Sequence, residues 1–396
     1  MLSEVARPYI TASVPVLREH GERITRTFYA DMFQAHPELT HVFNMGNQQS
    51  GVQQTALASA LFAYAANIDQ ASALAPVVDR IVHKHAAVGI KPAHYPIVAR
   101  HLLGAIRKVL GDAATPELLA AWDEAYWLLA GELIAAEARL YQSTGAEAGA
   151  LTALDVVRVQ PEAHAVTSFY LQKDGGSPGG FEPGQYVSVA VELPGGQRQL
   201  RQYSLSAAPS EPYWRISVKR EAAGAASPAG QVSSFLHANV APAGRLLVSA
   251  AYGNFTPLRA AGDRPLALLT AGVGITPVLS ALLALAERQS SRPILFAHAA
   301  QSASEQLFSG ELERAAAHLP QLRRLTWHER SPAPGARLGR MQLDAAALAG
   351  FEEAQFCLCG PSGFMREQYR ALLALGISPL RIEREVFGPD LLEHLR

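Results

Sequence analysis

The spacing of apolar residues changes twice along this chain of 396 residues, and each change indicates a different kind of fold. Up to about residue 141, apolar residues recur at helical spacing and no run alternates with a period of two. From residue 153, short strand-like runs lie between glycine–proline clusters, and from about 262 apolar strands alternate with helical stretches. We therefore expect a multidomain protein: an all-α domain at 1–141, a linker at 142–151, an antiparallel barrel or sandwich at 152–262 and an α/β domain with a parallel sheet at 263–396.

Charge and cysteine content exclude several classes of protein. The 34 basic residues are balanced by 35 acidic ones, so bulk charge does not favour nucleic acid and we expect no such partner. The chain has only two cysteines, Cys357 and Cys359, which point to opposite faces of an expected strand. A disulfide scaffold and a four-cysteine zinc site are therefore excluded.

One uncharged stretch resembles a membrane span in length. Residues 265–286 carry no charge over 22 positions, enough to cross a bilayer. However, Gly272, Gly274 and Pro277 interrupt it, so we expect a buried strand, a glycine turn and a buried helix instead. The N-terminus has no apolar core of signal-peptide length. We expect a cytoplasmic protein with no integral membrane segment and no obligate protein partner.

Two polar residues lie on apolar faces of predicted helices. His85 shares the apolar stripe of residues 74–90, and Glu137 shares that of residues 117–141. A buried imidazole needs partners, so His85 is either a core residue bonded to a carbonyl or a ligand of a metal or haem. Glu137 either supports His85, as carboxylates support ligating histidines, or reaches solvent at the helix end.

Two strings in the β-rich part have the chemistry of a flavin site. In RQYSL (201–205), Arg201 and Tyr203 project to one face of a strand. Arginine suits a diphosphate, although a purely structural role is the alternative. GQVSSFLH (230–237) predicts a glycine turn into a helix N-terminus, where anions bind.

Two glycine turns in the last part predict a nucleotide site. LLTAGVGITPVLS (268–280) and LCGPSGFM (358–365) each read as a strand, a glycine turn and a helix. Such ligands bind at the carboxyl edge of a parallel sheet. No acidic or basic cluster directly follows the strand at 293–299. This strand end therefore does not distinguish the two coenzymes, and we expect NADH with NADPH as the alternative.

The first 141 residues resemble the globin domain of the flavohaemoglobins. The matching stretches are FYADMF (28–33), HPEL (36–39), FNMGNQ (43–48) and KHAAVGIKPAHYPIV (84–98). The resemblance implies that haem b is bound through iron by His85, with Tyr95 and Glu137 hydrogen-bonded to that ligand. It also implies a distal pocket of Tyr29, Gln53 and Leu57, with Phe43 on the haem face and Lys84 near the proximal side.

The remaining residues resemble the ferredoxin–NADP⁺ reductase family, which implies an antiparallel β-barrel for FAD at 152–262 and an NAD(P)H module at 263–396. The implied FAD contacts are Tyr186, Arg201, Gln202, Tyr203, Ser204, Gln231, Val232 and Ser233. The implied coenzyme contacts are Ala271, Gly272, Val273, Gly274, Ile275, Thr276, Cys359, Gly360 and Pro361. The terminal segment Glu385, Val386, Phe387, Gly388 and Pro389 matches the flavohaemoglobin C-terminus, where Phe387 would shield the flavin and Glu385 would lie between flavin and haem.

Together these resemblances imply a nitric oxide dioxygenase. It would convert nitric oxide and dioxygen to nitrate at haem, re-reduced by NAD(P)H through FAD, and so detoxify nitric oxide. The alternative is an NAD(P)H oxidase or alkyl hydroperoxide reductase that uses the same electron-transfer path from NAD(P)H through FAD to haem. A gas sensor would need an output module, which the sequence does not show.

Overall fold

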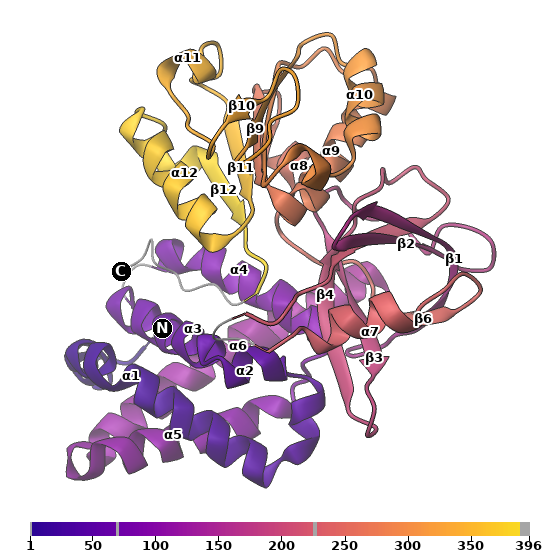
Figure 1. Ribbon diagram of the computed structural model, residues 1–396. Helices are drawn as coiled ribbons and strands as arrows, with labels where there is room; N and C mark the ends of the chain where they lie inside the picture. Colours follow the sequence, from indigo (N-terminus) through magenta and orange to yellow (C-terminus); the bar gives the residue numbers. More distant parts are fainter. Residues whose placement is uncertain (1, 69–70, 225–227, 389–396) are drawn as a thin grey trace.

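The computed structural model describes residues 2–68, 71–224 and 228–388. Three units follow one another along the chain: a helical unit, an antiparallel sheet and a parallel sheet (Figure 1). The multidomain fold expected from the changes in apolar spacing is confirmed.

The first unit is helical throughout, as expected. Its core is a cluster that includes Phe28, Met32 and Trp122. The last helix is capped by Thr115, whose hydroxyl accepts a hydrogen bond from the Leu118 amide, and it continues to Thr144, beyond the predicted end at 141. The elements are α1 (Arg7–Ala35), η1 (Pro37–His41), α2 (Met45–Gln49), α3 (Val52–Ala66), α4 (Ala71–Val88), α5 (His94–Leu110), η2 (Gly111–Ala113) and α6 (Pro116–Thr144).

The second unit is a six-stranded antiparallel sheet with the order β4-β3-β6-β1-β2-β5. Inward residues Val187, Val189 and Val191 alternate along one strand and bury its apolar face. Between the edge strands, the described residues show one bridge, from Leu205 to Ile216, so a closed barrel is not shown. The elements are β1 (Thr152–Ala163), β2 (Val166–Gln172), β3 (Tyr186–Glu192), β4 (Arg198–Ser204), β5 (Trp214–Lys219), α7 (Gln231–Asn239) and β6 (Arg245–Val248).

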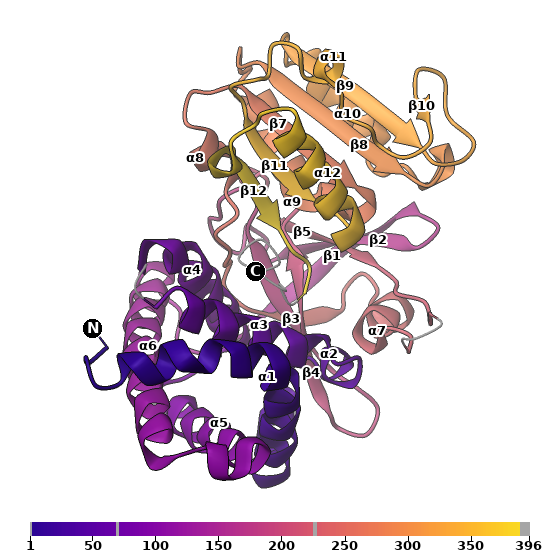
Figure 2. The ribbon, with the colours of Figure 1, turned by 90° about the vertical axis from the view of Figure 1, so that its left-hand side faces the viewer.

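The third unit is a parallel sheet with the order β10-β9-β8-β7-β11-β12 and helices packed on it (Figure 2). The order reverses between β7 and β11, which is where ligands bind in such sheets. The elements are α8 (Pro257–Ala261), β7 (Leu266–Ala271), η3 (Gly272–Gly274), α9 (Ile275–Glu287), β8 (Ile294–Ala300), η4 (Ala303–Glu305), α10 (Ser309–Ala317), β9 (Leu322–His328), β10 (Arg337–Leu338), α11 (Ala345–Leu348), β11 (Gln355–Cys359), α12 (Ser362–Ala374), η5 (Pro379–Arg381) and β12 (Ile382–Glu385).

The uncharged stretch 265–286 forms β7, its glycine turn and most of α9, as predicted. The strand is buried in the sheet and the helix lies among buried residues such as Leu279 and Leu282. In the part of the chain that the structure describes, no helix is both long and apolar enough to cross a membrane.

The three units contact one another through apolar side chains. Ala86 and Ala87 of α4 pack with Tyr186 and Tyr252 of the second unit. Val166, also from the second unit, packs into the core of the third. In both Figure 1 and Figure 2, β12 runs down toward α4, so the C-terminal segment approaches the helical unit.

Candidate active site

Three side chains from three helices meet in the helical unit. The Nδ1 atom of His85 lies 2.8 Å from Oε1 of Glu137 and 3.2 Å from the hydroxyl of Tyr95. The Tyr95 hydroxyl donates to the same Glu137 oxygen at 2.6 Å. Because this carboxylate engages Nδ1, Nε2 is the nitrogen of His85 that remains able to bind a metal.

Burial isolates this set from solvent and fixes the protonation of Tyr95. Glu137 is only 2% exposed, so its carboxylate does not reach solvent at the helix end. Burial and the hydrogen bond to Glu137 raise the pKa of Tyr95 far above its usual value, so its hydroxyl keeps its proton and donates. Tyr126 donates to the backbone oxygen of Tyr95 at 2.7 Å and holds the start of α5 in place.

A second group of predicted residues lies in the apolar core of the same unit. Tyr29 is buried, and its ring meets the ring of Phe43 edge-on at 5.8 Å between centroids. Gln53 Nε2 lies 3.5 Å from the Tyr29 hydroxyl, and Leu57 packs in the same cluster. Burial raises the pKa of Tyr29 to about 12, partly offset by hydrogen bonds from Gln53 and Gln48. Tyr29 is therefore a neutral hydrogen-bond donor at physiological pH.

These residues fit a haem better than a protein-coordinated metal ion. In the described part of the chain, no group of three or more His, Cys, Asp or Glu residues could hold a metal. A single imidazole such as that of His85 suits an iron whose other in-plane ligands come from a macrocycle. Gln48 belongs to this region but was not predicted as a site residue, although it lies in the matching string FNMGNQ.

The predicted flavin residues lie on two paired strands. Tyr186 of β3 is opposite Ser204 of β4, and Val187 is opposite Tyr203. Among the described residues, Arg201 bonds neutral acceptors alone, at 2.7 Å to the oxygen of Leu200 and 3.2 Å to Oε1 of Gln199. Burial lowers the pKa of Arg201, and no carboxylate among the described residues forms an ion pair with it. A half-buried guanidinium of this kind suits an anionic diphosphate.

The first turn of α7 offers backbone amides. Gly230 precedes it without a side-chain cap, and the Ser233 hydroxyl donates to the oxygen of Gly230 at 3.1 Å. Val232 is buried in the core, while Gln231 is exposed. The uncapped amides of this turn are available to an anion. Gln202 is exposed and donates to Ser188, so it does not point into the sheet core.

The two glycine turns interlock at the carboxyl edge of β7 and β11. A Cβ atom on Gly274 would lie 2.4 Å from the backbone oxygen of Cys359. A Cβ atom on Gly360 would lie 2.7 Å from the ring of Phe364, and Gly272 has a φ of 55°. Only glycine allows the two turns to approach this closely. As a result, the N-termini of α9 and α12 lie together at the carboxyl edge of the sheet. The other predicted coenzyme residues lie in these turns or directly beside them: Ala271, Val273, Ile275, Thr276 and Pro361.

Arg330 also lies near this edge, and the sequence analysis did not identify it. Its backbone amide donates to the oxygen of Gln301 at 2.8 Å, and its Nη2 donates to Oε1 of Gln301 at 3.0 Å. The residues just after β8 are those that meet the coenzyme ribose in such folds. No local signal marks Arg330, because 29 residues separate it from Gln301.

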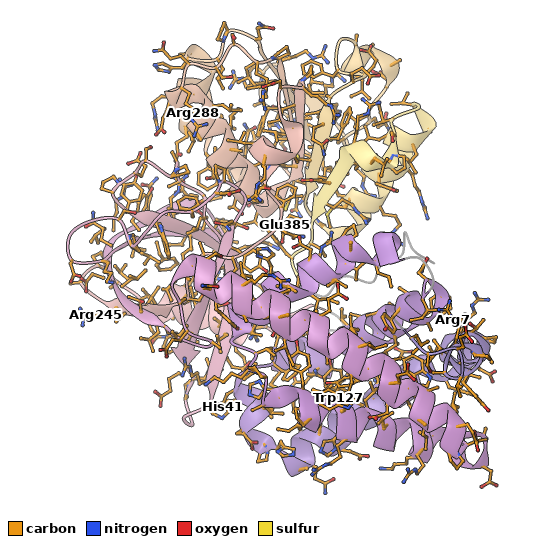
Figure 3. The ribbon with its side chains drawn as sticks, turned by 180° about the vertical axis from the view of Figure 1, so that it is seen from behind. Arg7, His41, Trp127, Arg245, Arg288 and Glu385 are labelled. Atoms are coloured by element: carbon orange, nitrogen blue, oxygen red, sulfur yellow. The ribbon has the colours of Figure 1, made fainter. Side chains whose placement is uncertain are left out.

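The C-terminal segment meets the helix that carries His85. Lys84 donates to the backbone oxygen of Gly388, and Glu385 is buried where the helical and α/β units meet (Figure 3). The Gly253 amide donates to Nδ1 of His83 at 2.9 Å. Val386 lies in the same segment, and Phe387 is half-exposed. Pro389, also predicted as a site residue, lies outside the described residues.

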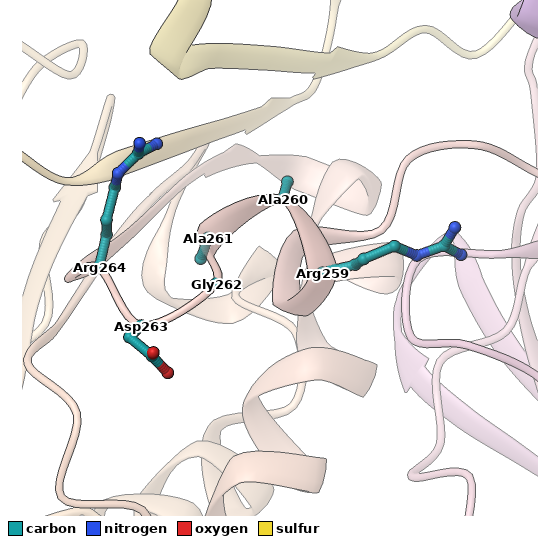
Figure 4. A pocket seen from close by; sticks show the side chains of 6 residues that line it. All are labelled: Arg259, Ala260, Ala261, Gly262, Asp263 and Arg264. Atoms are coloured by element: carbon teal, nitrogen blue, oxygen red, sulfur yellow. The ribbon is translucent and has the colours of Figure 1, made fainter.

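A shallow pocket at α8 lies apart from the predicted haem, flavin and coenzyme residues. It is lined by residues 259–264, and its side chains Arg259 and Arg264 point in different directions (Figure 4). Arg259 bonds instead to Glu182. No predicted site residue lines this pocket.

Known proteins resemble the chain over nearly its full length. The globin family model matches residues 26–133, and the oxidoreductase NAD-binding domain model matches 268–369. A flavohemoprotein from Bordetella parapertussis is 47% identical, with 98% of this chain and 99% of the relative covered. A flavohemoprotein from Rhizobium meliloti is 42% identical, with 99% of each chain covered.

Solved structures agree with this comparison. The flavohemoglobin from Malassezia yamatoensis with bound FAD and heme has a TM-score of 0.89 and 32% identity, covering 98% of this chain and 100% of that one. The FAD/NAD-binding domain of nitric oxide dioxygenase from Vibrio cholerae has a TM-score of 0.55 and 39% identity. The match covers 60% of this chain and 98% of that domain.

Proposed function

Because this chain belongs to the flavohaemoprotein family, we propose that it is a nitric oxide dioxygenase that detoxifies nitric oxide. Nitric oxide, dioxygen and one electron together give nitrate, and NAD(P)H supplies the electrons through FAD. We assign haem to 1–141, FAD to 152–262 and NAD(P)H to 263–396, with 142–151 as linker. The observation that carries the proposal is the His85–Glu137–Tyr95 set in the same chain as two nucleotide sites.

Haem b, when bound, supplies the iron at which the two gases react. His85 would bind it through Nε2, and Glu137 makes the imidazole a stronger donor by accepting at Nδ1. Tyr95 fixes the Glu137 oxygen by donating to it. An electron-rich proximal ligand favours oxygen activation over reversible storage, which supports an oxidative enzyme.

Tyr29 and Gln53 would act on the opposite side of the pocket. The neutral Tyr29 hydroxyl can donate a hydrogen bond to a polar ligand, and Gln53 lies within 3.5 Å of its oxygen. Leu57 and Phe43 surround this donor with apolar side chains and limit access of water. Hydrogen bonds are stronger in such a low-dielectric pocket.

FAD, when bound, accepts a hydride and releases its electrons one at a time. Arg201 and the first turn of α7, with Gln231, Val232 and Ser233, would hold its diphosphate. The rings of Tyr186 and Tyr203, with Ser204 beside them, would hold its ring systems, and Gln202 would lie at the edge. We place Glu385, Val386, Phe387, Gly388 and Pro389 at the flavin and Lys84 at the junction with haem.

The interlocked glycine turns would admit NAD(P)H next to the flavin. The N-termini of α9 and α12 offer amides to the pyrophosphate at the edge where strand order reverses. Gly272 and Gly274 allow the coenzyme to approach the backbone. We assign Ala271, Val273, Ile275, Thr276, Cys359, Gly360 and Pro361 to the same site.

The alternative, an oxidase or alkyl hydroperoxide reductase, would use the same residues. The similarity to a nitric oxide dioxygenase from Vibrio cholerae favours the dioxygenase. Nitrate formation from nitric oxide by NADH-reduced protein in air tests the proposal. Oxygen consumption without loss of nitric oxide would favour the alternative.

We place the protein in the cytoplasm, where NAD(P)H is available. Both cysteines are buried and unpaired, which suits a reducing compartment. Cell fractionation with an antibody tests this location. As a nitric oxide dioxygenase, the protein would act on the small molecules dioxygen, nitric oxide and NAD(P)H.

A further inference from the structure

One buried arginine joins the flavin unit to the coenzyme unit. Arg215 of β5 is only 3% exposed. Its Nη1 and Nη2 atoms donate to the two carboxylate oxygens of Glu311, at 2.5 and 3.0 Å. Its Nε donates to the Ser206 hydroxyl at 3.0 Å, and Nη2 donates to the Ser206 carbonyl at 2.6 Å. The guanidinium is therefore held rigidly by residues of both units.

The two partners of Arg215 belong to segments beside the two proposed cofactor sites. Ser206 follows the proposed flavin residue Ser204 by two positions. Glu311 lies in the first turn of α10, directly after the loop that leaves the carboxyl end of β8. The Arg215 side chain thus connects the segment just after β4, next to the proposed flavin site, to the start of α10, next to the proposed coenzyme site.

The start of α10 is strained in a way that supports this link. Phe308 precedes the helix with a φ of 57°, a left-handed conformation that is uncommon for an aromatic residue. Its buried ring lies under the guanidinium of Arg215, with 5.0 Å from Cζ to the ring centroid. Such strain persists only where the surrounding structure enforces it, and it often marks functional positions.

Apolar packing gives the two units a fixed contact, and two exposed polar contacts, Ser210 with Glu287 and Arg259 with Glu182, also cross the interface. Val166 and Phe255 of the flavin unit pack in the core of the coenzyme unit. Apolar contacts hold two surfaces together but have little directional preference. The bidentate pair of Arg215 and Glu311 adds the orientation that the apolar contact lacks.

We propose that Arg215 and Glu311 are a positioning pair that sets the approach of NAD(P)H to the flavin. The inference rests on the proposed function, because it assumes hydride transfer between these two cofactors. Hydride donors and acceptors react at about 3–3.5 Å, and a misplacement of about 1 Å can cost about 100-fold in rate. A fixed contact beside both sites holds the hydride donor and acceptor at this distance.

A third titratable group, Glu162, lies close enough to interact with the pair. Glu162 of β1 has a buried carboxylate oxygen with no partner among the described residues. Burial raises the pKa of Glu162, while Arg215 lowers it and Glu311 raises it, so the three groups interact. A chain of hydroxyls, from Ser168 through Ser217 to Ser206, connects this region to Arg215.

The experiment compares E311Q and R215K with the wild-type holoenzyme by anaerobic rapid mixing with NADH. E287Q is the matched control, because Glu287 joins the same two units through exposed Ser210. We expect flavin reduction by NADH to slow by about 10- to 100-fold in E311Q and R215K, and not in E287Q. The isotope effect with NADH deuterated at C4 should rise, while the dissociation constant for NAD⁺ and the FAD content stay unchanged.

Two results separate the inference from the proposed function. If E311Q reduces its flavin at the wild-type rate, or loses only thermal stability or FAD, the positioning role is overturned. If the wild-type flavin is not reduced by NADH at all, the proposed function fails instead.

Discussion

Glu137 binds both His85 and Tyr95 through one carboxylate oxygen, at 2.8 Å from the imidazole and 2.6 Å from the hydroxyl. The three residues come from α6, α4 and α5, so the set exists only when these helices pack. It defines the proximal side of the proposed haem site and motivates the first prediction.

Glu137→Gln should reduce nitric oxide consumption by about 10- to 100-fold. The amide cannot make the imidazole as basic as the carboxylate does, and losses of this size are usual for such supporting residues. Turnover and haem content of the purified protein measure the effect. Glu132→Gln, an exposed change on the same helix, is the control. Wild-type turnover in Glu137→Gln would contradict the assigned role.

Tyr29→Phe should speed dissociation of dioxygen from the ferrous protein by about tenfold or more. The change removes a buried donor whose hydrogen bond to a charged or polarised ligand is worth about 1.5–3 kcal/mol. Flash photolysis or stopped-flow displacement by carbon monoxide measures the rate. Tyr64→Phe, which removes a hydroxyl bonded to Ala125 in the same unit, should leave it unchanged. Equal rates in both variants would remove Tyr29 from the distal pocket.

Gly274→Ala should impair reduction of the flavin by NADH while the haem spectrum stays normal. The new methyl group would overlap the Cys359 backbone, and such overpacking costs about 1–3 kcal/mol and displaces the turn. Gly363→Ala lies near the same edge but has no atom within 4 Å, so it should behave as wild type. Rapid mixing with NADH distinguishes the two. Normal reduction in Gly274→Ala would place the coenzyme elsewhere.

Acidification should destabilise the α/β unit through His298. Burial lowers the pKa of this histidine to about 4, below its unfolded value of 6.5. The unfolded chain therefore binds a proton that the folded chain does not, so stability is complete above pH 6.5 and falls as the pH drops toward 4. The loss in the free energy of unfolding is roughly 3 kcal/mol once the pH is below 4. Denaturant unfolding at several pH values should show this slope, and His298→Gln should flatten it. The same slope in both proteins would exclude His298 as its source.

Arg330→Ala should lower kcat/KM for NADPH by about tenfold and leave that for NADH unchanged. Arg330 lies against Gln301, just after β8, where an arginine can receive the 2′-phosphate that NADH lacks. Steady-state dye reduction with each coenzyme measures the ratio. Arg324→Ala, an exposed arginine within β9, is the control. If both coenzymes are affected equally, Arg330 does not select between them.

The sequence contains enough information to predict the elements and several side-chain directions. Helical spacing placed His85 and Glu137 on apolar faces, and their contact is observed. The glycines of the two turns predicted close backbone approach, which Gly274 shows. These features depend on short-range periodicity and local turn geometry, which a single sequence records.

Other features depend on contacts between distant parts of the chain. Arg215 and Glu311 lie 96 positions apart and belong to different units, and no local motif marks either residue. Arg330 likewise gains its position only when β8 and β9 pair. The end of α6 also differs from the predicted boundary, because the polar residues 142–144 continue the helix until Gly145 adopts a left-handed conformation at φ 64°.

The most direct test of the account is the nitrate yield of the purified holoenzyme supplied with NADH, dioxygen and nitric oxide. The account predicts one nitrate for each nitric oxide consumed, and His85→Ala should abolish this reaction while NADH still reduces an artificial dye. Consumption of NADH and dioxygen without loss of nitric oxide would contradict it.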